Sequence, residues 1–418
     1  MWTAIKSISS LLLSFGMLLL GNGMTGTLLG IRSRLEGFST GTTGFIMAGY
    51  SVGLLLGALF ATRVVATVGH IRAFAAFASI MSVAVLAHVL IIEPIVWFAL
   101  RVVAGFCMAG MVMVVESWVN ERATNSTRGR ILSLYMMTNY MGAGLGQFML
   151  LLDDPAQFQL FVIASMVYSF ALVPILLTRS SAPKPSSPQR TNFRELFAVS
   201  PVGVYGTICA GMTNASLNSM GAVFAKDAGL SISQVSTFMA MALFGGMVMQ
   251  FPLGRMSDRF DRRTVLAVAA LATATAAYAV IWATSQPVLT LIIAAGFFGG
   301  FCFAIYPLSS SQVNDLADPD KLVQVAAGVL ISYGIGASVG PILVAQSMAF
   351  YGPQGMFYFI AAINGSLLVF TIVRILQRDR GDKEKAPFIP LGGTGVSSKQ
   401  LYTAALSNAE HIVPDDKQ

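Results

Sequence analysis

The sequence predicts an all-α polytopic membrane protein with twelve transmembrane helices in two pseudo-symmetric six-helix bundles. Hydrophobic residues make up 55% of the 418 residues and charged residues only 11%, whereas a soluble domain carries about a quarter charged residues. The mean hydropathy is +0.71. Apolar stretches of roughly 20 residues recur along the chain, each long enough to cross a bilayer core of about 30 Å as a helix. The middle of the chain also repeats its beginning.

The apolar stretches define the twelve predicted spans. They lie at residues 9–29, 42–62, 73–92, 95–116, 131–151, 158–178, 201–221, 234–254, 264–284, 288–310, 323–347 and 355–376. Glycines and polar residues interrupt spans 2, 7 and 11, so their limits are the least sharp. A cleaved signal peptide is the alternative for span 1, but eleven further spans and the lack of a small-x-small cleavage motif argue against it.

The internal repeat has an offset of about 195 residues. The matched positions are GFCMA at 105–109 with GFCFA at 300–304, VNERA at 119–123 with VNDLA at 313–317, and Gly142 and Gly146 with Gly336 and Gly340. Glycines four apart let a neighbouring helix approach closely, either for static packing or for a sliding contact. Parallel duplication of a block of helices builds two halves around a central path, as in many secondary transporters.

The predicted domains follow from this repeat. Two six-helix halves, residues 1–178 and 200–377, are joined by a cytoplasmic linker at 179–199, which is rich in proline and serine and too polar to pack. Residues 378–418 form a charged tail without helical periodicity, which we expect to be disordered. The tail is either a solvated terminus or a regulatory segment.

Charge and cysteine content exclude several classes of function. Most of the 26 lysines and arginines fall in segments on the same side as the N-terminus, so the positive-inside rule places both termini in the cytoplasm. The net charge of +7 is therefore a topology signal and does not indicate nucleic-acid binding. Cysteines and histidines are too few and scattered for a metal site. The sequence also shows no nucleophile–base pair, so we do not expect an enzyme. We expect no cofactor.

The loop between spans 8 and 9 reads GRMSDRFDRR at 254–263. It resembles the cytoplasmic loop signature of the major facilitator superfamily, and the first-half loop at 61–72 departs from that signature because it lacks the aspartate. Physically, Asp258 can cap a helix end while arginines engage helix carbonyls, so the cluster can hold one conformation shut. The expected latch residues are Gly254, Asp258, Arg259, Arg262, Arg263, Glu121, Arg128, Arg130 and Asp315, the last with Lys321.

Two further segments carry the resemblance. LRVVAG at 100–105 is similar to the fourth-helix motif of the superfamily, and ESWVNERA at 116–123 with RGR at 128–130 resembles the YcaD-like group of bacterial permeases. The resemblance covers about residues 1–377. It implies the major facilitator fold, transport by alternating access and a place in the bacterial inner membrane, but no substrate.

Every charged residue except Arg101 and Glu116, both in span 4, falls in a loop, a tail or a span end. An ionised side chain in the bilayer costs at least ~2.5–3.5 kcal/mol, so it usually faces a cavity or a partner. Arg101 is expected to bind an anionic substrate group or to support a proton-coupled step; the alternative is that it reaches the outer interface. Glu116 is expected to accept a proton or bind a cation, or else to pair with Arg63 or Arg130.

Uncharged polar residues within spans are weaker candidates for the substrate cavity, since they can equally pair helix to helix. They are Asn22, Thr25, Asn139, Tyr140, Asn214, Asn218 and Tyr333. Span 1 has no acidic residue, unlike many proton-driven drug exporters of the superfamily. Span 5 lacks the Gly-Pro pair of the antiporter signature, and Gly340-Pro341 lies in the second half instead. Both features disfavour a drug/proton antiporter.

Together these observations predict a monomeric inner-membrane permease that moves a small solute, with an anion favoured by Arg101 and with protons as the coupling ion. The first alternative is a passive facilitator, because so few charges lie in the membrane. The second is a non-transporting sensor or assembly protein that acts through its cytoplasmic tail.

Overall fold

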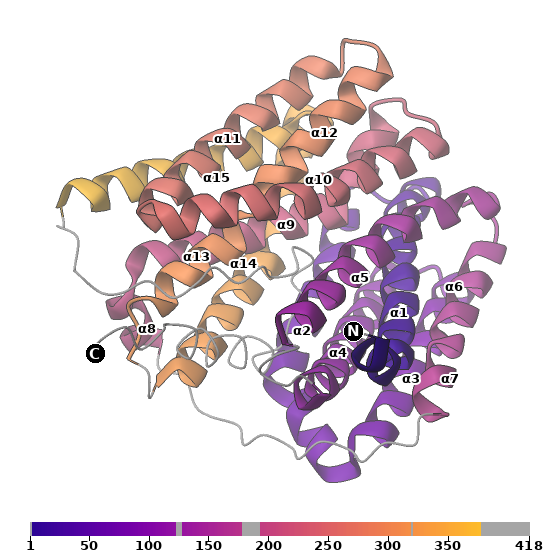
Figure 1. Ribbon diagram of the computed structural model, residues 1–418. Helices are drawn as coiled ribbons and strands as arrows, with labels where there is room; N and C mark the ends of the chain where they lie inside the picture. Colours follow the sequence, from indigo (N-terminus) through magenta and orange to yellow (C-terminus); the bar gives the residue numbers. More distant parts are fainter. Residues whose placement is uncertain (1, 123–127, 178–192, 319–320, 378–418) are drawn as a thin grey trace.

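The computed structural model describes residues 2–122, 128–177, 193–318 and 321–377, and this part of the chain is helical without strands (Figure 1). The helices are α1 Trp2–Leu35, α2 Thr40–Val68, α3 His70–Leu90, α4 Pro94–Arg122, α5 Arg128–Phe148, η1 Met149–Leu152, α6 Gln159–Phe170, α7 Leu172–Leu176, α8 Phe193–Val199, α9 Pro201–Asp227, α10 Ile232–Arg259, α11 Arg262–Ala283, α12 Val288–Cys302, α13 Ile305–Asn314, α14 Leu322–Tyr351 and α15 Gly355–Gln377.

Every predicted span corresponds to a helix or to a consecutive pair of helices. Span 6 is divided into α6 and α7, and span 10 into α12 and α13. Ten of the described spans are long and apolar enough to cross a membrane by length and composition. The other two predicted spans correspond to α5 and α9, which carry more polar residues and pack against the opposite half. The all-helical membrane fold is confirmed.

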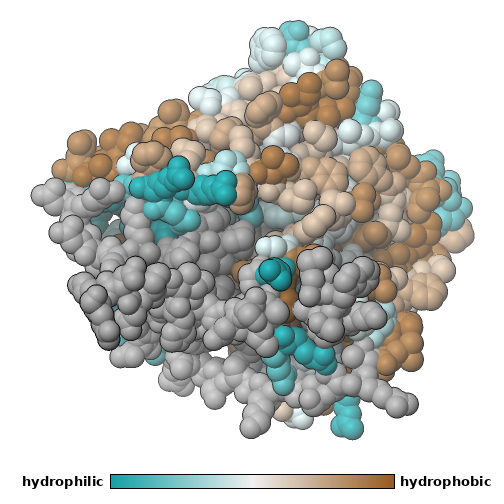
Figure 2. All heavy atoms as spheres, in the orientation of Figure 1, coloured by the Kyte–Doolittle hydropathy of each residue, from teal (hydrophilic) through white to brown (hydrophobic). Residues whose placement is uncertain are grey.

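The outer surface has the character of a surface that faces lipid. Large apolar side chains such as Val83, Trp282, Phe350 and Leu376 are more than half exposed. Figure 2 shows hydrophobic side chains over the outer faces of the helices, with hydrophilic ones gathered mainly toward the helix ends. Apolar patches of this extent are rare on soluble monomers, and a bilayer would cover them.

The two halves pack their helices in the same way. In the first half α1 lies on α5, and in the second half α9 lies on α14. A Cβ atom on Gly146 would lie 2.2 Å from the Leu20 carbonyl oxygen, and one on Gly340 would lie 2.5 Å from the Met212 carbonyl oxygen. The aligned glycines of the sequence repeat therefore make equivalent backbone contacts in the two halves.

The α2–α4 crossing depends on a second close approach. A Cβ atom on Gly105 would lie 2.0 Å from the Tyr50 carbonyl oxygen. We expect Gly105→Ala to destabilise the protein by about 1–3 kcal/mol, because overpacking forces the two backbones apart. The melting temperature of the detergent-solubilised protein measures the effect.

The matched control for that substitution is Gly365→Ala on α15, where an added Cβ meets no atom within 4 Å. This change should leave stability unchanged or raise it by up to about 1 kcal/mol through helix propensity. Equal melting temperatures for the two variants would show that the α2–α4 crossing tolerates a side chain.

The halves meet through α1 with α9, α2 with α14 and α5 with α10. We call the end that carries Arg34 and the α9–α10 connection the Arg34 end, and the end that carries the α10–α11 connection the Arg262 end. In Figure 1 the two halves lie closer together at the Arg34 end, at the upper right, than at the Arg262 end. The close approach of α2 to α14 agrees with this arrangement, since a Cβ atom on Gly44 would lie 2.6 Å from the Pro341 carbonyl oxygen.

The predicted linker differs in part from the structure. Its last residues form α8, and Leu196 on this helix is only 2% exposed because it packs into the core of the second half. Burial of this apolar side chain stabilises the short helix after the proline-rich stretch. The prediction missed the helix because the linker as a whole is polar. Residues 179–192 and the tail at 378–418 lie outside the described residues.

Candidate functional site

A cavity of about 70 Å³, lined by both polar and apolar residues, lies between the two halves. Seven helices line it: α1, α2, α4 and α5 from the first half, and α9, α10 and α14 from the second. Its polar lining residues are Asn22, Thr27, Tyr50, Ser51, Arg101, Gln147, Asn218, Ser219 and Tyr333. A cavity shared by two packed halves is a place where a solute can contact both.

Arg101 is the charged residue among the described lining residues. The side chain comes from the first half of α4 and is 4% exposed. Its guanidinium carbon lies 4.4 Å from the centroid of the Tyr50 ring, an arrangement typical of a cation–π contact. Its Nε has no hydrogen-bond partner, and no carboxylate of the described residues pairs with it. The side chain therefore lies in the cavity rather than at the outer interface.

Tyr50 is held in place beneath this guanidinium. Its hydroxyl donates a hydrogen bond of 2.7 Å to Oδ1 of Asn22. This bond ties α2 to α1 and occupies the acceptor of the Asn22 amide. The amide nitrogen of Asn22 remains the group that can donate to a molecule in the cavity.

Gln147 is a lining residue that sequence reasoning missed. Thr27 Oγ1 donates to its Oε1 at 2.6 Å, and its Nε2 donates to the Gly23 carbonyl oxygen at 3.1 Å. These bonds fasten α5 to α1 at the cavity wall. Gln147 is an uncharged amide in an apolar span, so the criterion that selected Asn139 and Tyr140 would have found it. Tyr50 meets the same criterion.

The seven predicted cavity residues divide into two groups. Asn22, Asn218 and Tyr333 line the cavity. The other four are buried elsewhere among the helices. Thr25 donates to the Gly21 carbonyl oxygen at 2.7 Å, and Asn214 accepts from Cys302 Sγ at 3.2 Å.

Tyr140 has a different position, because it joins the two halves. Its hydroxyl accepts a hydrogen bond of 2.7 Å from Nε2 of Gln250, which links α5 to α10. Its ring meets the edge of Phe303, with the ring centroids 6.3 Å apart. Asn139, the preceding residue, is fully buried on α5. Tyr140 is thus a contact between the halves rather than a cavity wall.

Glu116 lies outside the cavity, although it shares α4 with Arg101. The residue is fully buried and accepts a hydrogen bond of 2.6 Å from the Tyr135 hydroxyl on α5. Arg63 and Arg130, its expected alternative partners, are exposed. The structure therefore brings Arg101, but not Glu116, to the space between the halves.

Among the described residues, several expected latch residues of the second half come together. Arg262 is the centre of this cluster: its Nε lies 2.5 Å from Asp315 Oδ2, its Nη1 donates to Ser257 Oγ at 2.9 Å, and Asp258 lies 3.8 Å away. The side chain of Arg262 is 1% exposed. A neighbouring pair joins Arg263 to Asp261 at 3.1 Å. The contacts of Arg262 connect α11 to α10 and to Asp315, the residue that follows α13, within one half.

The remaining latch residues are placed differently. Gly254 is buried on α10, whereas Arg259, Glu121 and Arg130 are exposed at the Arg262 end. The side chain of Arg128 lies outside the described residues. The helix cap expected of Asp258 is made instead by Asp261, whose carboxylate accepts from the backbone N–H of Arg263 at 2.8 Å.

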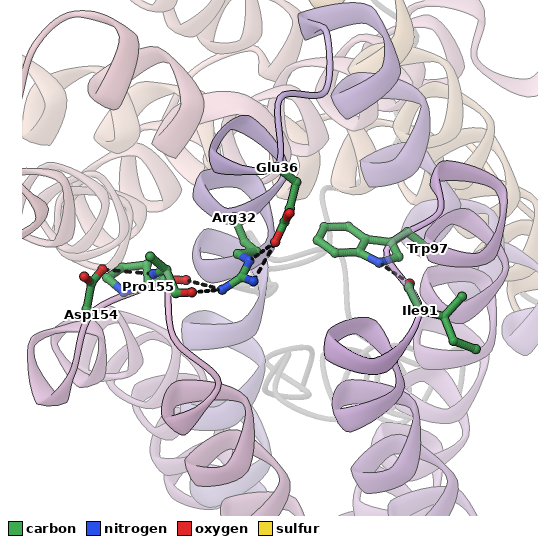
Figure 3. Close-up of polar contacts among 7 residues, drawn as sticks. Arg32, Glu36, Ile91, Trp97, Asp154 and Pro155 are labelled. Carbon is green, nitrogen blue, oxygen red and sulfur yellow. Dashed lines mark hydrogen bonds and ion pairs between the residues drawn. The ribbon is translucent and has the colours of Figure 1, made fainter.

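An ion pair joins the halves at the Arg34 end. Arg34 Nε on α1 lies 3.5 Å from Asp227 Oδ1 on α9, without hydrogen-bond geometry. Beside it, Arg32 pairs with Glu36 and donates to the carbonyl oxygens of Pro155 and Ala156, which fastens α1 to the α5–α6 connection (Figure 3). The first pair closes the interface between the halves, and the second stays within the first half.

Breaking the pair between the halves should favour opening at the Arg34 end. The side chains of Arg34 and Asp227 are 31% and 24% exposed, so the pair contributes less than about 1 kcal/mol. We expect Asp227→Asn to increase the population of the open state by up to about fivefold. Electron-spin distance measurements between labels at Leu35 and Ala228 report that population.

Glu36→Gln is the control for this measurement, since it removes an ion pair within one half and should leave the distances unchanged. An unchanged distance distribution in Asp227→Asn would show that the Arg34–Asp227 pair does not hold the halves together.

Comparison with known proteins agrees with this architecture. Residues 11–205 and 203–409 each match the model of the family described as the Major Facilitator Superfamily. The uncharacterized MFS-type transporter YcaD of Escherichia fergusonii is 29% identical over 362 residues, which are 85% of this chain and 92% of the relative. The YcaD protein of Escherichia coli is 27% identical over 391 residues, 92% of this chain and 99% of the relative.

Solved structures share the fold at low sequence identity. A point mutant of the nucleoside transporter NupG superposes with a TM-score of 0.76 at 12% identity, covering 88% of this chain and 99% of that one. A bacterial homolog of the human lysosomal transporter Spinster, inward-facing and unoccupied, has a TM-score of 0.64 at 16% identity, covering 97% and 98%.

Proposed function

The chain belongs to the major facilitator superfamily, and from this premise we propose that it moves a small anionic solute by alternating access, with the central cavity as its binding site. The family and the relatives indicate that the chain is a multi-pass inner-membrane protein that functions in membrane transport and is not an enzyme. The observation that carries the proposal is Arg101, a buried cation whose Nε lacks a hydrogen-bond partner in a cavity that both halves line.

The alternating-access part of the proposal is supported by the asymmetry of the two ends. The halves are in close contact at the Arg34 end, where the Arg34–Asp227 pair joins them. The positive-inside expectation places this end outside the cell, so the conformation is closed to the outside. In the opposite conformation, we propose that Asp258 and Arg259 join Glu121 and Arg130 across the halves at the Arg262 end.

The solute is to be found by a thermal-shift screen of the purified protein against metabolites, followed by uptake of each hit into proteoliposomes. We expect anionic hits, whose transport is lost when Arg101 is replaced by alanine. Transport of a hit that is unaffected by this replacement would overturn the assignment of the site.

Proton coupling is proposed to involve Glu116 and its hydrogen-bond donor Tyr135. Glu116→Gln should abolish accumulation driven by an imposed pH gradient, because the amide cannot carry a proton across the cycle. Exchange of labelled for unlabelled solute should persist, since exchange needs no net proton movement. Uptake by wild type and variant, each with and without the gradient, measures both.

Tyr135→Phe is the companion variant, because it removes the 2.6 Å hydrogen bond but keeps the carboxylate. It should retain gradient-driven uptake with a shifted pH profile. Wild-type uptake that ignores the pH gradient, and is intact in Glu116→Gln, would contradict the coupling.

A passive facilitator is the second candidate. Its supporting observation is that no described lining residue of the cavity is a carboxylate, so the proposed proton site lies away from the solute. Equal internal and external solute concentrations under every imposed gradient would favour it. Transport unchanged by deletion of residues 378–418 would count against a sensor that acts through the tail.

A further inference from the structure

We infer that the cavity selects short organic monocarboxylates that carry a second oxygen group, with the carboxylate bound by Arg101. The inference rests on the proposed function and deepens it by naming the chemical class of the solute. It follows from four properties of the cavity: its charge, the exposed edge of the guanidinium, its apolar walls and its size.

The charge of the cavity favours a single negative charge. Arg101 is its one cation and no carboxylate is present among the described lining residues. A buried charge is costly unless it is paired, so a monoanion leaves the cavity neutral. A dianion would leave its second charge buried without a partner, and a cation would face Arg101 with no counter-charge.

The stacking of Arg101 determines how the anion binds. The Tyr50 ring covers a face of the guanidinium at 4.4 Å, so that face is not available to a ligand. The N–H groups lie in the guanidinium plane and form a fork that matches the two oxygens of a carboxylate. Nε has no hydrogen-bond partner among the described residues. A carboxylate oxygen at this edge would accept a hydrogen bond from Nε. The Asn22 amide nitrogen is a further donor from the same half.

Part of the cavity wall is apolar. It is formed by Leu54, Ala143, Ala215, Met239, Leu243 and Ala337. These walls fit a short carbon chain and would strip water from inorganic phosphate or sulfate without replacing the lost hydrogen bonds. Asn218 and Tyr333, from the second half, are polar groups that can meet a hydroxyl or carbonyl oxygen of the same molecule.

The size of the cavity limits the length of the solute's carbon chain. Its volume is about 70 Å³, less than half of the roughly 150 Å³ of an engineered cavity that holds benzene. About six non-hydrogen atoms is therefore the upper limit for a solute. Glycolate, lactate and pyruvate do not exceed this limit and have the other three properties.

Exchange of radiolabelled lactate across proteoliposomes that contain the full chain tests the inference. The competitors, each titrated over the same range of concentrations, are glycolate, pyruvate, succinate, phosphate, choline and uridine. We expect glycolate and pyruvate to inhibit at tenfold lower concentration than the other four. Absence of lactate exchange, or stronger inhibition by succinate, phosphate, choline or uridine, overturns the inference.

An Arg101→Lys variant tests the fork itself, because lysine keeps the charge but loses the planar pair of donors and the stack on Tyr50. We expect its affinity for lactate to fall at least tenfold. The control is Arg255→Gln, which removes an exposed arginine stacked on Phe251 at 4.1 Å outside the cavity and should leave exchange unchanged. Equal lactate affinity in Arg101→Lys and wild type would overturn the bidentate contact.

The two levels of the proposal fail in different ways. If another class of solute is exchanged and lactate is not, the monocarboxylate assignment is wrong and transport through the cavity stands. If the metabolite screen yields no solute that the reconstituted protein moves, the transport proposal itself fails.

Discussion

Replacing Arg101 by glutamine should weaken solute binding about ten- to a hundredfold and leave the melting temperature of the empty protein unchanged or higher. The folded protein holds this cation at 4% exposure without a carboxylate partner among the described residues. Burying an unpaired charge costs free energy, so a neutral side chain of similar size relieves the empty state. The solute loses charge-assisted hydrogen bonds worth about 1.5–3 kcal/mol, a loss of ten- to a hundredfold in affinity.

Two measurements on one sample decide this prediction: the melting temperature without solute, and the shift of that temperature on adding solute. A structural arginine would lower the first, whereas a solute-binding arginine affects only the second. A fall of several degrees in the empty Arg101→Gln protein would therefore show that Arg101 supports the fold. Arg101→Met, which is also neutral and of similar length, should behave in the same way.

Arg262→Gln should have the opposite result and destabilise the protein by about 3–5 kcal/mol, the usual cost of breaking a buried ion pair. The guanidinium is 1% exposed and lies 2.5 Å from the carboxylate of Asp315, which is 11% exposed. Glutamine removes the charge that compensates this carboxylate and also the hydrogen bond to Ser257. Denaturation of the detergent-solubilised protein, followed by loss of helical circular dichroism, measures the change.

The double variant Arg262→Gln with Asp315→Asn separates the pair from its surroundings. Because the two residues interact directly, the double variant should regain part of the stability that Arg262→Gln loses. Asp258→Asn is the control, since its side chain is 43% exposed and 3.8 Å from Arg262, so it should change stability by less than about 1 kcal/mol. Fully additive effects of the two substitutions would contradict a direct pair.

The opposite expectations for these two arginines show what the linear sequence leaves open. Both are arginines of apolar helices: Arg262 begins α11, and Arg101 lies within α4. Arg101 was expected to bind an anionic group or to support a proton-coupled step, with the outer interface as the alternative, and its side chain lines the cavity. Arg262 was expected in a cluster that holds one conformation shut, and it contacts Asp315, Ser257 and Asp258 of its own half.

Glu116 shows the limit of reasoning from one helix. At about 100° per residue, Arg101 and Glu116 lie roughly 60° apart around α4 and share a helix face, but one face can border different neighbours along its length. Near Arg101 that face borders the cavity, whereas at Glu116 it packs against Tyr135 of α5. The neighbouring helix decides what a residue faces, and helical periodicity does not identify that neighbour.

The amino-acid sequence by itself determined the all-helical membrane fold, the limits of most spans and the equivalence of the two halves. These properties depend on local hydropathy and on short repeats such as Gly146 with Gly340, whose backbone contacts are equivalent. Tertiary structure alone decided which polar residues meet. Asn22, Arg101, Gln147, Asn218 and Tyr333 line one cavity because seven helices from two halves converge there. That convergence depends on contacts between segments far apart in the chain, and no local pattern encodes them.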